Sequence, residues 1–501
     1  MQKIGVIDIG SNSIRLVLVG LYDSLSFRII DEIKEAVRLG KDMDKDEQLH
    51  PYRIEKAIEV LSFFKKVCTA SGIDKIVAVA TEAVRKASNQ KYFVNRVLGE
   101  TGIKIRVLSG FEEAYYDYFA IVNSMDVNEG LVMDIGGKST ELIWINDRNI
   151  KEALSLPIGA INLTEKFSLD KSMDTSSIEA LNGFIKETLR SVPWLKKIIG
   201  LPLIGVGGTI RNIGKINKKR LNYPLDHSHN FHMDSHEIIE IYNSIKDKSP
   251  NELKKVKGLS KDRSDIFFGA LTVVSNIIEF CSISEVYISG NGLREGIIYE
   301  HVLGDKKPVE DVLDFSLNNM INYYRLNKTH SNQVWNIAAS LFYQLKPIHE
   351  IEISPNKILK TASLLHDCGI HISYYHHEKH SFYIILNSPI RGLTHREQLI
   401  AAYVSAFHRK DEFTINNYTH KKLLSQEDLL LIKKLGVILR ISESLDKGMN
   451  SNIEELQCII EKEIVKIKIS SKFSPTMEIE DAMSAATVFN KLFNKKLIIE
   501  S

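Results

Sequence analysis

Two short stretches of the sequence carry an acidic residue and a hydroxyl group at the same spacing. Residues 5–20 read GVIDIGSNSIRLVLVG and residues 131–146 read LVMDIGGKSTELIWIN. In the alignment of the two, Asp8 corresponds to Asp134, and the turn after each contains glycine and serine. Backbone N–H groups and hydroxyls in such a turn suit phosphate oxygens, and the preceding aspartate can hold Mg²⁺ directly or through water. The pair of stretches therefore predicts two turns that share one phosphorylated ligand.

The elements that position these turns are expected to be strands, because an apolar run precedes and follows each turn. Each stretch thus predicts a β-hairpin, and residues 26–40 continue the first one as a meander. Asp134 lies 126 residues after Asp8, which suits a duplicated domain and is far longer than a solenoid repeat. Two domains with matching turns imply a cleft between them, with one turn on each side.

Strands and helices alternate around both hairpins. Apolar residues at helical spacing predict helices over 52–70, 176–198 and 235–247, and apolar runs predict strands over 75–80 and 103–108. Such alternation is typical of α/β domains in which helices cover the faces of the sheets.

The character of the chain changes after about residue 305, where helical periodicity dominates and ten of the sixteen histidines lie. A hairpin over 457–470 and a helix over 481–494 are then expected in a small α+β tail. We therefore expect four domains: α/β over 1–125, α/β over 126–304, all-α over 305–450 and α+β over 451–501.

The composition is that of a globular protein without an overall nucleic-acid signature, with 44% hydrophobic residues, 26% charged residues and a net charge of +2 over 501 residues. Four scattered cysteines without a CxxC pair suit a reduced compartment. The first apolar strand leaves no room for a signal peptide, and no apolar run approaches the length of about 18 residues that crosses a bilayer. We expect a cytoplasmic protein that binds neither a membrane nor a specific nucleic acid.

Other residues of the α/β half carry groups suited to phosphate chemistry. Glu112 and Glu113 follow Ser109 at an expected helix start, where they either complement the helix dipole or supply a carboxylate that activates water. Arg85 is either a bidentate phosphate clamp or a solvated helix residue. A glycine-rich turn, GVGGT, lies at 205–209. The pattern of residues leaves these alternatives open.

The sequence resembles the exopolyphosphatase/guanosine pentaphosphate phosphohydrolase (Ppx/GppA) family in the order and spacing of six motifs: VIDIGSNSIRL, VATEAVRKA, VLSGFEEA, MDIGGKSTEL, GVGGT and GLREG. The resemblance covers roughly residues 3–303 and implies duplicated actin-like (ribonuclease H-like) domains of the actin-like and sugar-kinase-like ATPase superfamily. The long form of the family has a C-terminal helical extension known as HD-like, which the part of this chain after residue 305 resembles.

The resemblance implies hydrolysis of terminal phosphates from inorganic polyphosphate, or of the 5′-terminal phosphate of guanosine pentaphosphate. It places the water-activating carboxylate at Glu113, and the acidic residues that support Mg²⁺ and the water at Asp134 and Glu141. The hairpin pattern adds Asp8 as a further Mg²⁺ ligand. The phosphate-binding residues are expected to be Ser11, Asn12, Ser13, Arg85, Gly136, Gly137, Ser139, Thr140, Gly207, Gly208 and Thr209.

The sequence departs from the family at two places. Lys138 stands where the family usually has a third glycine, and its charge either helps to hold a polyanion beside the phosphate turn or narrows the choice of substrate. The last motif reads SGNGLREG, where relatives often have Asp-Gly-Ala before LREG. No cysteine or histidine lies in the six motifs, which favours direct attack by water over a phospho-enzyme.

The helical domain contains a second set of candidate metal ligands, namely His330, His366, Asp367 and Asp446. These residues resemble the ligand pattern of the HD metal-dependent phosphohydrolases, and nitrogen and oxygen donors together suit Mn²⁺, Fe or Zn²⁺. Four further histidines, either for a second metal or for anions, are His376, His377, His380 and His408. The alternative is a scaffold in which the histidines only pack and form hydrogen bonds.

The function expected from the sequence is a Mg²⁺-dependent exopolyphosphatase acting in the cleft between the two α/β domains. The alternatives are guanosine pentaphosphate hydrolysis in the same cleft, a sensor that binds phosphate or a nucleotide without turnover, and an HD phosphohydrolase regulated by the N-terminal half. A carboxylate at Glu113 together with Asp134 and Glu141 speaks against a pure sensor. Long-form relatives also imply a homodimer.

Overall fold

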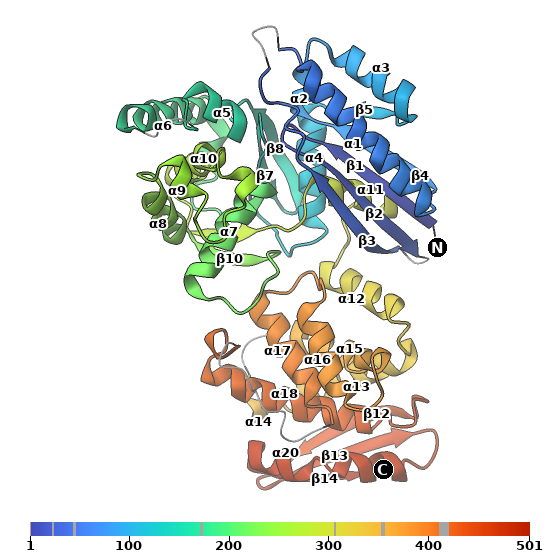
Figure 1. Cartoon of the computed structure of the whole chain (residues 1–501). Coiled ribbons are helices and arrows are strands. Elements are labelled where there is room, and N and C mark those ends of the chain that lie inside the picture. The colour runs from blue at the N-terminus through green and yellow to red at the C-terminus, as the bar shows by residue number, and fades with distance from the viewer. Residues whose placement is uncertain are drawn as a thin grey trace. The chain divides into compact units, whose positions relative to one another are not determined.

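The computed structural model describes residues 2–22, 25–43, 47–170, 174–304, 307–351, 356–409 and 420–501 (Figure 1). The chain divides into two compact units, Met1–Glu310 and Asp311–Ser501. The boundaries predicted at residues 125, 304 and 450 stay predictions. Among the described residues, none of the helices combines the length and the apolar character of a membrane span.

The first sheet has the strand order β3-β2-β1-β4-β5. Its strands are β1 (Gln2–Ile9), β2 (Ile14–Tyr22), β3 (Ser26–Glu35), β4 (Lys75–Ala80) and β5 (Ile105–Val107). The antiparallel meander predicted for the start of the chain is confirmed in β1, β2 and β3, while β4 and β5 run parallel to β1. The strands predicted over 75–80 and 103–108 are confirmed, and the second is shorter than expected.

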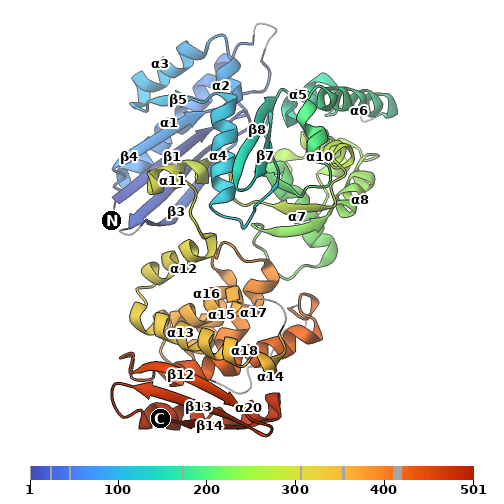
Figure 2. The same cartoon turned by 180° about the vertical axis from the view of Figure 1, so that it is seen from behind.

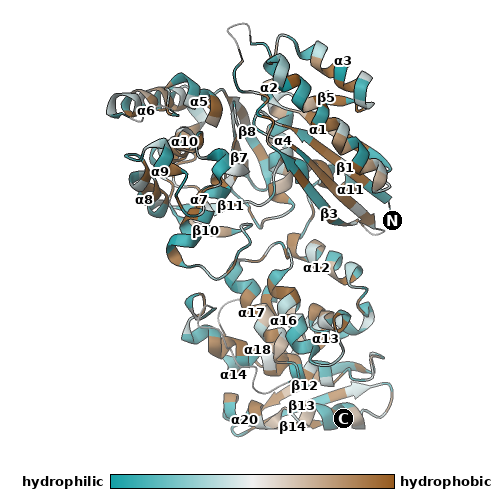
Figure 3. Ribbon diagram, in the orientation of Figure 1, coloured by the Kyte–Doolittle hydropathy of each residue, from teal (hydrophilic) through white to brown (hydrophobic). Residues whose placement is uncertain are grey.

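Helices α1 (Pro51–Ala70), α2 (Glu82–Lys86) and α3 (Gln90–Thr101) accompany this sheet. α1 confirms the helix predicted over 52–70. Its side chains Ile54, Leu61 and Phe64 are buried in one core with the strands, because they recur at helical spacing on one face. Figure 3 shows hydrophobic residues along the strands and hydrophilic residues on the outside of the helices.

The second sheet has the order β10-β11-β9-β6-β7-β8. Its strands are β6 (Gly130–Ile135), β7 (Thr140–Asn146), β8 (Asn149–Leu156), β9 (Leu203–Val206), β10 (Phe231–Asp234) and β11 (Glu285–Ile288). β6 and β7 form the second predicted hairpin, and β9 runs parallel to β6 on its other side. Helices lie around this sheet: α5 (Ala160–Lys166), α6 (Thr175–Arg190), α7 (Gly207–Leu221), α8 (Ser235–Ile245), α9 (Pro250–Leu253) and α10 (Phe267–Phe280).

Several helices of this part differ from the sequence-based expectation. α5, α7 and α9 were not predicted, and the glycine-rich turn expected at 205–209 runs directly into α7. The helix predicted over 176–198 ends at Arg190, and a separate 3₁₀ helix begins at Pro193, because proline has no N–H to continue the α-helical hydrogen bonding. α10 was not predicted. Its sequence, FFGALTVVSNIIEF, is buried nearly all round, so it lacks the amphipathic period by which surface helices are identified.

Helices α4 (Gly110–Val122) and α11 (Leu293–Leu303) pack against each other, and both views show α4 between the two sheets (Figures 1 and 2). Gly296 permits this contact, since a Cβ there would lie 2.0 Å from the carbonyl oxygen of Tyr116. Ile297 and Ile298 of α11 share a core with Ile4 and other residues of the first sheet. The last helix of the first unit therefore returns to the first sheet.

The second unit contains α12 (Val312–Tyr323), α13 (Lys328–Gln344), α14 (Lys346–His349), α15 (Asn356–Leu365), α16 (His377–Asn387), α17 (His395–Ala406) and α18 (Gln426–Ser444). After these come β12 (Ile453–Ile460), β13 (Ile464–Ser471), α19 (Thr476–Met483), α20 (Ala486–Phe493) and β14 (Lys496–Glu500). The hairpin predicted over 457–470 is confirmed as β12–β13. The helix predicted over 481–494 is wrong as a single helix, because α19 and α20 divide it, and β14, parallel to β13, was not predicted.

Candidate active site

The turns at the tips of the β1–β2 and β6–β7 hairpins have the same hydrogen-bonding pattern. In the first tip, the backbone N–H of Gly10 donates to the Ser13 carbonyl at 3.1 Å. In the second tip, the N–H of Gly136 donates to the Ser139 carbonyl at 2.9 Å. The internal repeat of the sequence is therefore a repeat of backbone geometry.

Backbone N–H groups of neighbouring segments donate hydrogen bonds to the carbonyl oxygens of both tips. Residues after β3 donate to the first tip, Gly40 to the Ser11 carbonyl at 2.8 Å and Arg38 to the Asn12 carbonyl at 2.9 Å. The start of α5 does the same for the second tip, where Ala160 donates to Gly136 at 3.0 Å and Ile161 to Gly137 at 2.6 Å. The acceptors of the tips are thus engaged by the protein itself.

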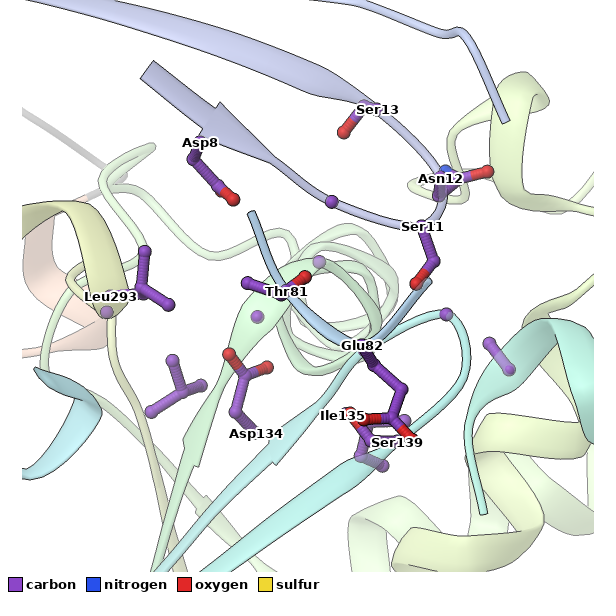
Figure 4. Close-up of a pocket in the computed structure, with 18 of the residues that line it drawn as sticks. Asp8, Ser11, Asn12, Ser13, Thr81, Glu82, Asp134, Ile135, Ser139 and Leu293 are labelled. Atoms are coloured by element: carbon purple, nitrogen blue, oxygen red, sulfur yellow. The ribbon is translucent and has the colours of Figure 1, made fainter. Parts of the chain in front are cut away.

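The two tips face each other across one pocket. A Cβ at Gly137 would lie 2.8 Å from the Cβ of Ser11, so the tips approach as closely as glycine allows. Figure 4 shows Asp8 and Asp134 with their carboxylates in the same pocket, one from each hairpin. The opposed tips that the sequence predicts are therefore found in the structure.

Most of the predicted phosphate and metal residues of this half line the pocket, namely Asp8, Ser11, Asn12, Ser13, Glu113, Asp134, Gly136, Gly137, Ser139, Gly207 and Gly208. Three other predicted residues, Thr140, Glu141 and Thr209, are not among the lining residues. Thr140 donates its hydroxyl to the Ile158 carbonyl at 2.6 Å, and Glu141 accepts a hydrogen bond from the Ser155 hydroxyl at 2.7 Å. Thr209 is buried in α7, next to two lining glycines.

Arg85 and Lys138 are engaged elsewhere in this structure. The Arg85 guanidinium donates to Glu113 at 2.9 Å, to the Leu108 carbonyl at 2.7 Å and to Glu82. The Lys138 amine lies 2.9 Å from the Met43 sulfur and outside the pocket lining, and burial lowers its pKa. Arg85 therefore holds the carboxylate at the pocket edge, and Lys138 does not face the ligand space.

The two glutamates at the start of α4 have different environments. Glu112 closes a capping box with Ser109, whose backbone N–H it accepts at 2.8 Å, and this hydrogen bond, assisted by Arg106, lowers the pKa of Glu112 to about 2. Glu113 instead points inward and lines the pocket. Burial, and then the neighbouring Glu141, raise its pKa well above the usual value. Glu113 is thus the glutamate available for proton transfer.

Buried carboxyl groups gather at and directly behind the pocket wall, and we call this group of residues, Asp8, Asp117, Asp134 and Glu141, the acidic floor of the pocket. Burial raises the pKa of Asp134 to about 6 and that of Glu141 to about 7, and in each case a neighbouring carboxylate adds to the shift. Burial also raises the pKa of Asp8. Asp117, one turn after Glu113, is fully buried with neither carboxylate oxygen hydrogen-bonded to any described residue. An all-oxygen donor set with excess negative charge fits a hard divalent cation such as Mg²⁺.

Asn12 stands out in the first tip. It is buried, yet neither its amide nitrogen nor its amide oxygen has a hydrogen-bond partner within the described ranges. Buried polar groups are nearly always satisfied, so an unpartnered amide in a pocket wall indicates a ligand that completes it.

Four arginines of the pocket wall were missed from the sequence: Arg15, Arg211, Arg263 and Arg294. Arg211 donates to the Gly290 carbonyl at 2.9 Å, and burial and then Arg15 lower its pKa to about 10. Arg15 and Arg294 share one oxygen of Glu32, at 3.2 and 2.6 Å. Glu82, Thr81 and Glu295 also line the pocket without having been predicted. The available signals were the GLREG motif for Arg294 and the position of Arg211 four residues after Gly207.

Glycines allow the close approaches at the start of α7. Gly207 has φ +84°, and a Cβ there would lie 2.1 Å from an Asp134 carboxylate oxygen. A Cβ at Gly208 would lie 2.2 Å from the guanidinium carbon of Arg263, and the Arg263 side chain makes no hydrogen bond or ion pair with another described residue. The N-terminus of α7 therefore lies directly against both the acidic floor and a free cationic group.

The second set of predicted ligands also comes together, within the second unit. His330 lies 2.8 Å from Asp446, 3.3 Å from His366 and 3.8 Å from Asp367, measured between their nearest ring nitrogens and carboxylate oxygens. His377 and His408 lie beside Asp367 as well. His376 is exposed. The HD-like fold of this region stays a prediction.

Comparisons with known proteins agree with this geometry. Residues 17–304 match the model of the Ppx/GppA phosphatase family, and residues 312–482 match that of Ppx/GppA phosphatase domain III. The chain is 26% identical over 437 residues, 86% of both chains, to a guanosine-5′-triphosphate,3′-diphosphate pyrophosphatase of Vibrio vulnificus. It is 32% identical over 308 residues to a bifunctional 3-dehydroquinate synthase/phosphatase of Fusobacterium nucleatum, a match that covers 59% of this chain and 46% of that protein. The chain thus spans less than half the length of the Fusobacterium relative.

Solved structures show the same fold in the N-terminal part. A Ppx/GppA family member from Aquifex aeolicus has a TM-score of 0.53 and 28% identity, and the match covers 61% of this chain and 99% of that one. An exopolyphosphatase from Cytophaga hutchinsonii has a TM-score of 0.57 at 24% identity, with 60% and 98% of the two chains covered. The actin-like fold expected for the N-terminal half is thereby confirmed.

Proposed function

We propose that this chain, which belongs to the Ppx/GppA phosphatase family, hydrolyses phosphoanhydride bonds and that its substrate is inorganic polyphosphate. The terminal phosphate lies between the two hairpin tips and is released as orthophosphate. The observation that carries this choice is the set of four arginines in the pocket wall, Arg15, Arg211, Arg263 and Arg294. Guanidinium groups bind phosphate oxygens in a bidentate manner, and several of them suit a chain of phosphates.

Each wall of the pocket has its own part in binding. The tips offer the hydroxyls of Ser11, Ser13 and Ser139 and the unpartnered amide of Asn12. The N-terminus of α7 adds the positive end of a helix at Gly207. Together these groups neutralise and orient a phosphate, and in phosphoryl transfer positioning and charge stabilisation supply most of the catalysis.

Glu113 is the group that activates water in this proposal. Its carboxylate accepts a proton from a water molecule, whose oxygen forms a bond to the terminal phosphorus as the bridging P–O bond breaks. The shortened polyphosphate leaves with the electron pair of that bond. Arg85 holds Glu113 in place through its 2.9 Å ion pair and favours the deprotonated form.

The acidic residues fit Mg²⁺ as the cofactor of this site. Asp8 and Asp134 would hold the cation from opposite hairpins, with Glu141 supporting them from behind. When bound, the cation would neutralise charge on the phosphate oxygens. All the donors are carboxylates, so the site would favour hard divalent cations over transition metals.

Guanosine pentaphosphate is the second candidate substrate. It is favoured by the match to the Vibrio vulnificus protein, which extends over 86% of both chains. The same pocket and the same carboxylates would then act on the 5′-terminal phosphate. The purine would be bound by residues outside the lining described above.

The test is a comparison of kcat/KM for long-chain polyphosphate and for guanosine pentaphosphate, measured as orthophosphate release by the full-length protein. We expect polyphosphate to be the better substrate. Arg263→Ala should lower kcat/KM for polyphosphate without unfolding the protein, since the Arg263 side chain has no hydrogen bond or ion pair to lose among the described residues. A preference for guanosine pentaphosphate, or unchanged polyphosphate kinetics in Arg263→Ala, would overturn this choice of substrate.

Two further expectations accompany the proposal. All four cysteines are free, which suits the reduced cytoplasmic setting proposed from the sequence. Resemblance to long-form relatives also leads us to propose a homodimer, which sedimentation of the purified protein would test.

A further inference from the structure

Five buried or nearly buried side chains converge in the second unit, apart from the phosphatase pocket. His330 comes from α13, His366 and Asp367 follow α15, His377 begins α16 and His408 follows α17. The four histidines are each at most 2% exposed. Five residues from four helices meeting in the interior is an arrangement that sequence spacing alone does not explain.

Hydrogen bonds fix the orientation of the imidazole rings. The Nδ1 atom of His366 lies 2.8 Å from the Ser363 carbonyl, and that of His377 lies 2.9 Å from the Tyr374 carbonyl. His408 has the same contact with the carbonyl of Ser405. A carbonyl oxygen only accepts, so in each ring Nδ1 carries a proton, and Nε2 of the neutral ring then carries a lone pair.

The fourth ring is held by a carboxylate. His330 Nδ1 lies 2.8 Å from one Asp446 oxygen, while the other oxygen of Asp446 accepts the backbone N–H of Ser451 at 2.9 Å. The second nitrogen of His330 thus also faces the cluster with a lone pair. Asp446, which the sequence suggested as a ligand, here orients His330.

The lone pairs point at one another in two pairs. Nε2 of His377 lies 3.0 Å from Nε2 of His408, and Nε2 of His330 lies 3.3 Å from Nε2 of His366. Neutral rings in these tautomers have no proton to place between the facing nitrogens. Facing acceptors at such distances repel each other unless a cation lies between them.

Each carboxylate oxygen of Asp367 lies beside a different histidine pair. Oδ1 lies 3.2 Å from His377 and 4.0 Å from His408. Oδ2 lies 3.5 Å from His366 and 3.8 Å from His330. The ligand atoms of each triad, His330–His366–Asp367 and Asp367–His377–His408, fall within 4.8 Å of one another. One carboxylate therefore joins two sets of converging donors.

We propose that this cluster is a two-metal centre, in which Asp367 bridges one divalent cation held by His330 and His366 and a second held by His377 and His408. The sequence left a second metal among four further histidines open; the structure selects His377 and His408 from them, and the Asp367 bridge and the orienting role of Asp446 go beyond the sequence-based expectation. The centre is independent of the phosphatase pocket in both residues and chemistry.

The donors determine the class of metal. Two imidazole nitrogens and one carboxylate oxygen per cation suit Mn²⁺, Fe²⁺ or Zn²⁺ and not the hard, all-oxygen preference of Mg²⁺ or Ca²⁺. Three protein ligands leave each cation coordination positions for water or an anion. The Asp367 side chain is 16% exposed, whereas the histidines are buried, so the cluster opens to solvent at the bridge.

Metal analysis of the full-length protein tests this proposal. The protein is stripped with a chelator and reloaded with Zn²⁺ in the presence of excess Mg²⁺, which occupies the carboxylate site of the phosphatase pocket. It is then desalted and analysed for zinc by elemental mass spectrometry. We expect two equivalents of metal in the wild type and in Glu113→Gln, one in His408→Ala and none or one in Asp367→Ala. The matched control is His376→Asn, which removes the exposed histidine beside His377 at φ +58° and should retain two equivalents.

Electron paramagnetic resonance of the Mn²⁺-loaded protein needs only the wild type, so its result does not depend on whether a variant folds. Two cations bridged by one carboxylate are expected to give an exchange-coupled spectrum, whereas isolated Mn²⁺ gives a simple six-line pattern. One equivalent or less in the wild type, two equivalents in Asp367→Ala, or an uncoupled spectrum at full loading would overturn the two-metal centre. Each of these outcomes leaves polyphosphate hydrolysis in the other unit unaffected.

Discussion

Asp134 lies directly opposite Glu141 in the β6–β7 hairpin, at the register position where Asp8 lies opposite Arg15 in the β1–β2 hairpin. One copy of the repeat thus pairs an acid with a base, and the other pairs an acid with an acid. The acidic pair is buried, so burial first and mutual repulsion second raise the pKa of Glu141 to about 7. The two hairpins have the same backbone geometry but different side chains, and the negative charge is concentrated in the second hairpin.

Removing one carboxylate of that pair should weaken cation binding and at the same time stabilise the metal-free protein. In Glu141→Gln, we expect the Mg²⁺ concentration for half-maximal activity to rise by about 10-fold or more, as is usual when support for a metal ligand is lost. The free energy of unfolding without metal should rise, because Asp134 loses a repulsive neighbour. Mg²⁺ titrations after chelator treatment measure the first effect and thermal melts the second. Glu152→Gln, an exposed change on β8, should alter neither.

Arg85 should set the acid limb of the pH–activity profile. In the proposed mechanism Glu113 acts only when deprotonated, and its pKa is raised by burial, so activity is expected to rise with pH well above the usual range of a glutamate. The positive charge of Arg85 opposes this shift. Arg85→Gln should therefore raise the pKa of Glu113 further and move the limb to higher pH.

The matched control for that profile is Arg106→Gln. Arg106 pairs with Glu112 on the exposed side of α4 and should leave the limb in place. A limb that stays fixed in Arg85→Gln would show that Glu113 does not titrate in this profile.

Asn12 should matter for binding and not for folding. Its buried amide has no partner in the described chain, so Asn12→Ala is expected to leave the melting temperature unchanged or slightly higher. The Michaelis constant for polyphosphate should rise by about 10-fold or more, as for a lost hydrogen bond to a charged group. By contrast, Asn162→Ala removes hydrogen bonds to Lys138 and Pro157 and should lower the melting temperature. A destabilised Asn12→Ala with normal kinetics would assign Asn12 a structural role.

Gly207 should be intolerant of any side chain. Gly207→Ala places a Cβ 2.1 Å from Asp134 at φ +84°, so we expect a loss of about 1–3 kcal/mol of stability and a greater than tenfold loss of activity. Gly183→Ala, on the exposed face of α6 with open space around it, should instead stabilise the protein by about 0.5–1 kcal/mol. Chemical denaturation of both variants makes the comparison. If the two variants changed stability equally, the side chain of Asp134 would have to move away from the new Cβ at position 207 without cost.

The parts of the fold that were predictable follow from short-range patterns. The two Asp-Ile-Gly turns lie between apolar runs, and this arrangement determines a hairpin without reference to the rest of the chain. The helix over 52–70 was predictable because one of its faces is apolar. α10 was not, since a helix buried on all sides has no polar face to mark its period.

The site was predictable where it lies on the repeated turns and not where it depends on packing. Arg263 ends the 3₁₀ helix Lys261–Arg263 and reaches the pocket over Gly208, and no sequence motif marks it as a pocket residue. Lys138 was expected beside the phosphate because of its place in the turn, but its amine lies near Met43 instead. Likewise, the division of Asp367 between two histidine pairs depends on how four helices meet.

The most direct test of polyphosphate hydrolysis in the pocket is the turnover number of Glu113→Gln beside that of Glu112→Gln. The two changes are chemically identical and adjacent, but Glu113 lines the pocket and Glu112 caps α4. We predict that Glu113→Gln lowers kcat for orthophosphate release from polyphosphate by about 10²–10⁴-fold, while Glu112→Gln retains most of it. Wild-type turnover in Glu113→Gln would contradict the assignment of the water-activating carboxylate.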